Sequence, residues 1–121
     1  MTKSKKWDWK YLWLTIIMSV FYGQIQWNNF IGDPDGFYHA KLAKWLSEGR
    51  LIESLPWMQF ASLRDSFTDH HLLYHLLLVP FTYFFDPLIG VKISAVIFSV
   101  LMVLGFYWLL KKMYIPGAFY F

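Results

Sequence analysis

Two long runs of uncharged, mostly apolar residues divide the chain. The first follows Lys10 and extends over 22 residues to Gly32. The second covers residues 88–110 and is interrupted by Lys92, one turn from its start, where a lysine side chain can reach the membrane interface. A helix of 22 residues rises about 33 Å, and the hydrocarbon core of a bilayer is about 30 Å thick. The pattern therefore predicts transmembrane helices over residues 11–30 and 88–110.

The first run also has the layout of a signal peptide, because a lysine-rich stretch precedes it. A cleavage site needs small residues after the apolar core, and bulky Trp27 and Phe30 stand there instead. The sequence therefore favours a retained span.

A third apolar segment, residues 70–85, is shorter. It has 16 uncharged residues, of which three are histidine, and Pro80 lies in its second half. Apolar stretches of about 10–14 residues are more often interfacial or re-entrant than spanning. The positive-inside rule places both the lysines of residues 1–10 and the pair Lys111–Lys112 in the cytoplasm, so an even number of crossings separates them. Two crossings satisfy this rule, and residues 70–85 then lie on the outer surface.

Residues 31–87 then form one external loop, in which the sequence predicts two amphipathic helices. The first covers residues 34–48, with Asp33 as its N-cap, Pro34 as its first residue and Gly49 just past its end. It carries one apolar stripe at helical spacing, which suits either a membrane surface or packing against the protein; the stripe consists of Tyr38, Leu42, Trp45 and Leu46.

The second helix of the loop is predicted over residues 70–85, with Thr68 or Asp69 as its cap. Residues 50–67, between the two helices, have the pattern of an irregular connector.

The end of the chain has the pattern of another membrane segment. Residues 111–121 begin with two lysines and continue as Pro-Gly followed by aromatic residues, which predicts a cytoplasmic turn and the start of a truncated third span. The predicted fold class is an all-α membrane protein with a cytoplasmic basic tail, residues 1–10, and two transmembrane helices joined by the external loop. We interpret the chain as the N-terminal fragment of a longer multi-span protein.

Composition and charge exclude several other classes. Hydrophobic residues make up 57% of the chain and charged residues only 16%, whereas soluble domains are usually nearer a quarter charged. The chain has no cysteine, so disulfide frameworks and thiol catalysis are excluded. The net charge of +3 comes from lysines at the two ends rather than from a basic face, so no nucleic acid partner is expected.

The first candidate site is the sequence Gly-Asp-Pro-Asp-Gly at residues 32–36. Asp33 and Asp35 stand where the first span leaves the membrane, and His39 follows Asp35 at i+4, on the same helix face. In a cleft, one carboxylate can act as a general base and the other can orient it or bind a metal ion. Asp-Pro and Asp-Gly are common turn and capping pairs, so turn formation and helix capping are the simpler explanation of the spacing taken alone.

The second candidate site precedes and begins the later external helix. Asp69 stands just before it, and His71 and His75 have the i, i+4 spacing that lets two imidazoles bind one metal ion. Arg64 is a candidate phosphate ligand, although an ordinary salt bridge to Asp65 is the simpler interpretation.

The order of these features resembles the N-terminal part of the GT-C glycosyltransferases, and most closely the oligosaccharyltransferase catalytic subunits and their bacterial and archaeal relatives. The resemblance rests on the order of spans and on three stretches of sequence: DPDGFYH at 33–39, LAKWLSEG at 42–49 and SFTDHHLLYHLLLVPF at 66–81.

This resemblance implies an active-site carboxylate at Asp35, with Asp33 as a second one. It further implies a divalent metal ion such as Mg²⁺ or Mn²⁺, a sugar donor linked to polyprenyl phosphate, and a protein, lipid or glycan acceptor at the outer face of the plasma membrane. The second acidic motif of the family would lie beyond Phe121, so the 121-residue chain alone is expected to be inactive.

A function of another class also fits the pattern. The chain would then be a small membrane protein without enzymatic activity, whose external helices bind a partner subunit. Coding DNA that continues in frame through further apolar spans would favour the enzyme, and a stop codon after Phe121 would favour the partner-binding protein.

Overall fold

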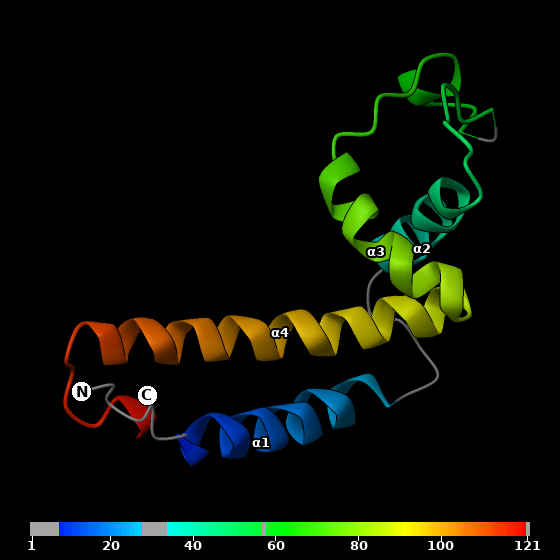
Figure 1. The fold of residues 1–121 in the computed structure, drawn as a ribbon. Helices are drawn as coiled ribbons and strands as arrows, with labels where there is room; N and C mark the ends of the chain where they lie inside the picture. Colours follow the sequence, from blue (N-terminus) through cyan, green and yellow to red (C-terminus); the bar gives the residue numbers. More distant parts are fainter. Residues whose placement is uncertain (1–7, 28–33, 57, 121) are drawn as a thin grey trace. The chain divides into compact units, whose positions relative to one another are not determined.

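A computed structural model describes residues 8–27, 34–56 and 58–120 of the chain (Figure 1). These residues contain helices and no strand, which confirms the predicted all-α class for the part described. The α-helices and the two short 3₁₀ helices are α1 (Trp9–Gln26), α2 (Pro34–Ser47), η1 (Ser62–Arg64), α3 (Leu72–Phe84), α4 (Pro87–Lys112) and η2 (Ala118–Tyr120).

The chain divides into two compact units. One combines residues 1–29 with residues 95–121, and the other is residues 30–94. The boundary falls within α4, whose first two turns belong to the second unit.

Helix α4 is the one described helix that is long and apolar enough to cross a membrane. Its 26 residues rise about 39 Å and extend the predicted span, 88–110, by one residue at the start and two at the end. The Asp86 carboxylate accepts hydrogen bonds from the backbone N–H groups of Leu88 and Ile89, at 3.0 and 3.4 Å, and so caps the first turn. Lys111 and Lys112 occupy the last turn, where cations complement the helix dipole.

Helix α1 is shorter and more polar than the span predicted over residues 11–30. Its 18 residues rise about 27 Å, and Lys10 lies in its first turn while Gln24 and Gln26 lie in its last. These polar ends shorten its apolar part, so two membrane-spanning helices are not shown among the described residues. Residues 28–30 of the predicted span lie outside the described residues.

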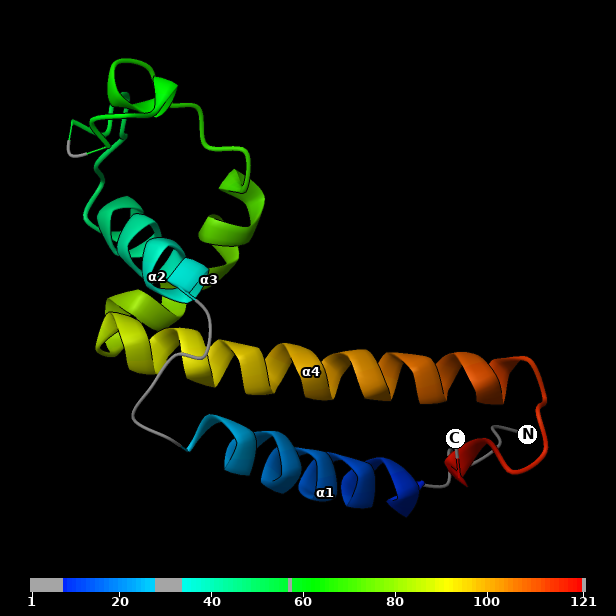
Figure 2. The same cartoon turned by 180° about the vertical axis from the view of Figure 1, so that it is seen from behind.

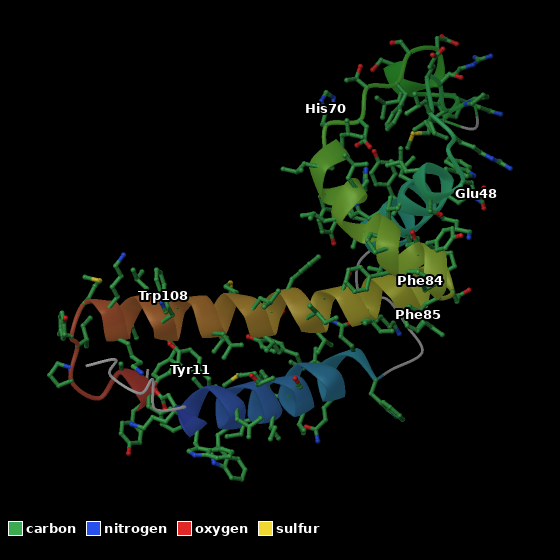
Figure 3. All side chains as sticks on the ribbon, in the orientation of Figure 1. Tyr11, Glu48, His70, Phe84, Phe85 and Trp108 are labelled. Carbon is green, nitrogen blue, oxygen red and sulfur yellow. The ribbon has the colours of Figure 1, made fainter. Side chains whose placement is uncertain are left out.

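In the first unit, α1 runs alongside residues 95–112 of α4 (Figures 1 and 2). The helices are joined near the start of α1, where Lys111 Nζ lies 2.5 Å and the Tyr107 hydroxyl 3.4 Å from the Asp8 carboxylate. The hydrogen bond from Lys111 lowers the pKa of Asp8. Tyr11 lies on the side of α1 that faces α4 and packs edge-on against Tyr107, with ring centroids 4.8 Å apart (Figure 3).

The residues after α4 turn back rather than continue as an α-helix. Tyr114 and Gly117 adopt positive φ angles of 56° and 72°, and residues 118–120 form the 3₁₀ helix η2. Phe119 thereby packs on Tyr107, with ring centroids 6.2 Å apart. The described part of the predicted third span is thus a turn and one 3₁₀ turn.

In the second unit, α2 and α3 pack side by side (Figures 1 and 2). Ala40 and Ala43 on α2 are buried and small, so the two backbones approach closely. The residues of α3 buried in this unit are His75, Leu78 and Thr82, which follow the i, i+3, i+7 pattern of one helix face.

The observed ends of α2 and α3 agree in part with those predicted from the sequence. Helix α2 ends at Ser47, one residue before the predicted end, and Gly49 has the positive φ of 75° expected of a C′ glycine. The predicted N-cap of α2, Asp33, lies outside the described residues. Helix α3 begins at Leu72, two residues later than predicted, because the Asp69 carboxylate accepts the His71 N–H at 2.9 Å and its carbonyl accepts the Leu72 N–H.

The connector between α2 and α3 is irregular, as predicted, but it is held by backbone hydrogen bonds. The Leu55 N–H donates to the Leu63 carbonyl at 3.0 Å, and the Phe67 N–H donates to the Glu53 carbonyl at 2.7 Å. Leu55 is also buried, at 1% exposure. These contacts fix the path of the chain into Asp69.

The corner between α3 and α4 depends on Gly90. A Cβ atom at this position would lie 2.7 Å from the Phe81 carbonyl oxygen and 2.9 Å from its carbonyl carbon. We expect Gly90→Ala to destabilise the protein by about 1–3 kcal/mol, because backbone atoms cannot move aside as a flexible side chain does. The matched control is Gly105→Ala in the same helix, where nothing lies within 4 Å and alanine should be neutral or stabilising. Thermal unfolding in detergent measures both, and equal midpoints would contradict the close approach.

Candidate functional site

A row of three hydrogen-bonded side chains joins α2 to α3 inside the second unit. His75 Nδ1 lies 2.6 Å from the Asp69 Oδ2 atom, and His75 Nε2 lies 2.7 Å from His39 Nδ1. His75 is fully buried, at 0% exposure, so its ring depends on these two partners for its hydrogen bonds. We call this arrangement the Asp69–His75–His39 row.

The chemistry of the row indicates which atoms carry protons. An ionised carboxylate only accepts, so His75 donates to Asp69 through Nδ1–H. The other nitrogen of a neutral His75 ring then accepts, and His39 donates through its Nδ1–H. A carboxylate behind a histidine fixes the tautomer and the orientation of its ring.

Aromatic side chains surround the row. The Tyr38 ring lies 5.8 Å from the His75 ring, and the Tyr74 ring lies 5.0 Å from the His39 ring, both edge-on. Burial raises the pKa of Tyr38, and the charges of Asp69 and Asp35 raise it further. Burial also raises the pKa of Tyr74. Both hydroxyl groups therefore stay protonated near neutral pH and can donate hydrogen bonds.

Asp35 lies in the first turn of α2, on the surface of the unit. It stands one helical turn before His39, so the same helix carries the candidate carboxylate and the end of the row. Its charge acts on the Tyr38 hydroxyl, as that of Asp69 does. The other predicted carboxylate, Asp33, lies outside the described residues.

The predicted pair of metal-binding histidines is arranged differently from the expectation. The rings of His71 and His75 are 6.3 Å apart, and both nitrogens of His75 are already hydrogen-bonded, to Asp69 and His39. His71 instead lies edge-on to His39, with ring centroids 5.4 Å apart. Among the described residues, no group of three or more histidine, aspartate or glutamate side chains is placed to hold a metal ion.

Two other residues from the sequence analysis lie away from the row. Arg64, in η1, forms an exposed ion pair with Asp65 at 3.8 Å, which is the simpler of the two interpretations of that arginine. His70 is exposed at the turn before α3 (Figure 3).

Two small apolar cavities lie next to the polar groups of this unit. One, of about 150 Å³, is bordered by Asp69 together with Leu42 and Leu72. The other, of about 210 Å³, is bordered by Tyr38 and Trp45. Carboxylate and hydroxyl groups at the edge of an apolar hollow are typical of ligand sites, in which few polar groups orient a mostly apolar contact.

The sequence analysis missed Tyr74 as a site residue, took Tyr38 only as part of an apolar stripe, and did not pair His39 with His75. A signal for the pairing was present. His39 shares a helix face with Leu42 and Ala43, at i+3 and i+4, and His75 shares one with Leu78 and Thr82. A histidine on the buried face of each of two neighbouring helices is a candidate for a bond between them.

Comparison of the chain with protein-family models, with curated proteins and with solved structures gives no match.

Proposed function

We propose that the chain forms the N-terminal part of a GT-C type membrane glycosyltransferase, which transfers a sugar from a polyprenyl-phosphate donor to an acceptor at the outer membrane face. The observation that carries this proposal is the placement of Asp35 one turn before His39, at the end of the Asp69–His75–His39 row. A carboxylate and an imidazole on one helix, with that imidazole hydrogen-bonded to a second histidine that is backed by a carboxylate, form a set suited to moving a proton.

The proposed reaction needs one proton transfer and one displacement. Asp35 accepts the proton of the acceptor's nucleophilic group, whose electron pair then forms a bond to the anomeric carbon of the sugar. The bond from that carbon to the phosphate oxygen breaks, and polyprenyl phosphate leaves with the electron pair. Attack from the face opposite the phosphate inverts the anomeric configuration.

A divalent metal ion is part of this proposal. Asp35 offers carboxylate oxygens, the ligands that Mg²⁺ and Mn²⁺ prefer, and Asp33 would be its neighbour in the ligand set. Such an ion would neutralise the phosphate of the donor as it leaves.

The proposed placement in the plasma membrane has two crossings. Helices α1 and α4 would span, the N-terminus and Lys111–Lys112 would be cytoplasmic, and residues 31–87 would be external. Helix α3 would lie on the outer surface, because its 13 residues rise only about 20 Å, against a core of about 30 Å.

We expect single cysteines to report this placement. The chain has no cysteine of its own, so Ser54→Cys, Ser66→Cys and Ser4→Cys each add one thiol. In intact cells an impermeant thiol reagent should label the first two and spare the third, which should react only after the membrane is opened. Labelling of Ser4→Cys but not of Ser54→Cys would overturn the topology.

The test of the function is transfer of a labelled sugar from a polyprenyl-phosphate donor in membranes that contain the protein encoded by the full reading frame. Transfer that depends on this protein supports the proposal. If transfer is absent and the protein is instead isolated in fixed ratio with another membrane protein, the partner-binding alternative is favoured.

A further inference from the structure

An apolar cavity of about 530 Å³ lies within the first unit, between α1 and the second half of α4. Ile17 and Phe21 line it from α1, Met102 and Phe106 line it from α4, and Phe119 of η2 is also part of its wall. Tyr107, which packs edge-on against Tyr11 of α1, also lines it. Its volume is in the range of about 300–1,000 Å³ that is typical of ligand pockets.

A second, more polar cavity of about 400 Å³ adjoins the first. The two share Tyr107, Ala118 and Phe119 in their walls, so they lie next to each other. The polar cavity is further bordered by Lys10 and Lys111.

The two lysines of the polar cavity differ in their partners. Lys111 is paired with Asp8, which cancels its charge locally. No ion pair involves Lys10 in the part of the chain that the structure describes; its Nζ atom lies 5.5 Å from the centroid of the Phe119 ring. The polar cavity therefore carries an excess of one positive charge at the end of an apolar groove.

We propose that this groove binds an anionic glycerophospholipid, with one acyl chain in the apolar cavity and the phosphate at Lys10. The combination of a long apolar wall and a cation at one end fits a molecule with an apolar chain and an anionic head. A transmembrane helix from another protein would fill the apolar part equally well, but it would not use the positive charge. Basic pockets between membrane helices on the cytoplasmic side bind anionic lipid headgroups in this way. The inference uses the proposed membrane placement and does not depend on sugar transfer.

The test compares the binding of two lipids that have the same acyl chains. The full chain is purified, freed of lipid and kept in detergent. Native mass spectrometry counts bound phosphatidylglycerol and phosphatidylcholine at equal concentration. We expect phosphatidylglycerol to be favoured about fivefold, which corresponds to about 1 kcal/mol for one lysine near a phosphate. Inorganic phosphate should not compete, because it lacks the chain.

Single substitutions distinguish the contribution of the Lys10 charge to lipid binding from that of the apolar groove. Lys10→Gln should reduce the preference for phosphatidylglycerol to about one, while Lys10→Arg keeps it. Lys41→Gln is the matched control, because it removes the same charge from a lysine that stacks on Trp45 in the other unit. Val103→Trp fills the groove and should prevent binding of both lipids.

Four outcomes would overturn the inference. Three are equal binding of the two lipids by the original chain, an unchanged preference in Lys10→Gln, and full binding in Val103→Trp. The fourth is competition by inorganic phosphate, which would assign the polar cavity to free anions instead. Thermal unfolding of each variant without lipid shows whether it is folded. If Val103→Trp does not fold, the comparison of Lys10→Gln with Lys10→Arg still tests the role of the charge.

Discussion

Replacing Asp35 by asparagine is expected to lower the rate of sugar transfer about 10²-fold or more, the usual contribution of a positioned general base. Asparagine keeps the size of the side chain and its ability to cap a helix, but it removes the charge that a base or a metal ligand needs. The rate is measured with a labelled polyprenyl-phosphate donor, and the amount of protein in the membrane is measured for each variant.

The control for Asp35→Asn is Glu48→Gln, which removes a charge just past the other end of α2. Glu48 is exposed and pairs with Lys44 and Arg50, so transfer should change little. If Asp35→Asn also transfers at a near-normal rate, Asp35 only caps the helix. Asp33→Asn should lower the rate of sugar transfer less than Asp35→Asn does if Asp33 is mainly a cap. If the two carboxylates share a metal ion, it should lower the rate as much or more.

The positions of helices could be predicted where the sequence contains local signals. Pro34 begins α2 and Gly49 follows its end, since both residues act through their own backbone geometry. The long apolar run after Asp86, interrupted only by Lys92, predicted α4 to within two residues at each end. Signals of this kind depend on neighbours in sequence and need no knowledge of the fold.

The start of α3 and the nature of α1 could not be predicted in the same way. Residues 70 and 71 look helical in sequence, but the carboxylate of Asp69 binds the His71 N–H and holds the chain in a turn. In α1, the uncharged amides near its end do not break a charge-free run, yet they shorten the apolar part of the helix. The absence of charged residues therefore did not predict the length of the apolar part of α1.

In the candidate site too, contacts within one helix could be predicted from the sequence and contacts between helices could not. The i, i+4 spacing predicts that Asp35 and His39 share a helix face, and it predicts the same of His71 and His75. The hydrogen bond that the structure contains, between His39 and His75, joins two helices through residues that are 36 positions apart in sequence. Its existence depends on how far each helix is rotated about its axis, and small residues such as Ala40 and Ala43 decide that by setting how closely the helices pack.

His75→Ala is expected to give the largest loss of stability in the second unit, about 3 kcal/mol. His75 is fully buried, and its removal leaves a void as well as a carboxylate and an imidazole without their shared partner. The unfolding midpoint should fall by more than about 10 °C, because about 1 kcal/mol lowers it by 4–8 °C in a domain of this size.

The matched control is His70→Ala, which removes an exposed histidine from the turn before α3 and should stay within about 0.5 kcal/mol of the original chain. A double-mutant cycle isolates the bond itself: His39→Ala and His75→Ala together should cost less than the sum of the two, with a coupling of about 0.5–3 kcal/mol. Thermal unfolding in detergent measures the four variants and the original chain. Equal midpoints for His75→Ala and His70→Ala, or strictly additive costs, would contradict the row. A coupled loss would mean that the same buried imidazole both fastens α2 to α3 and fixes the ring of His39, one turn from Asp35.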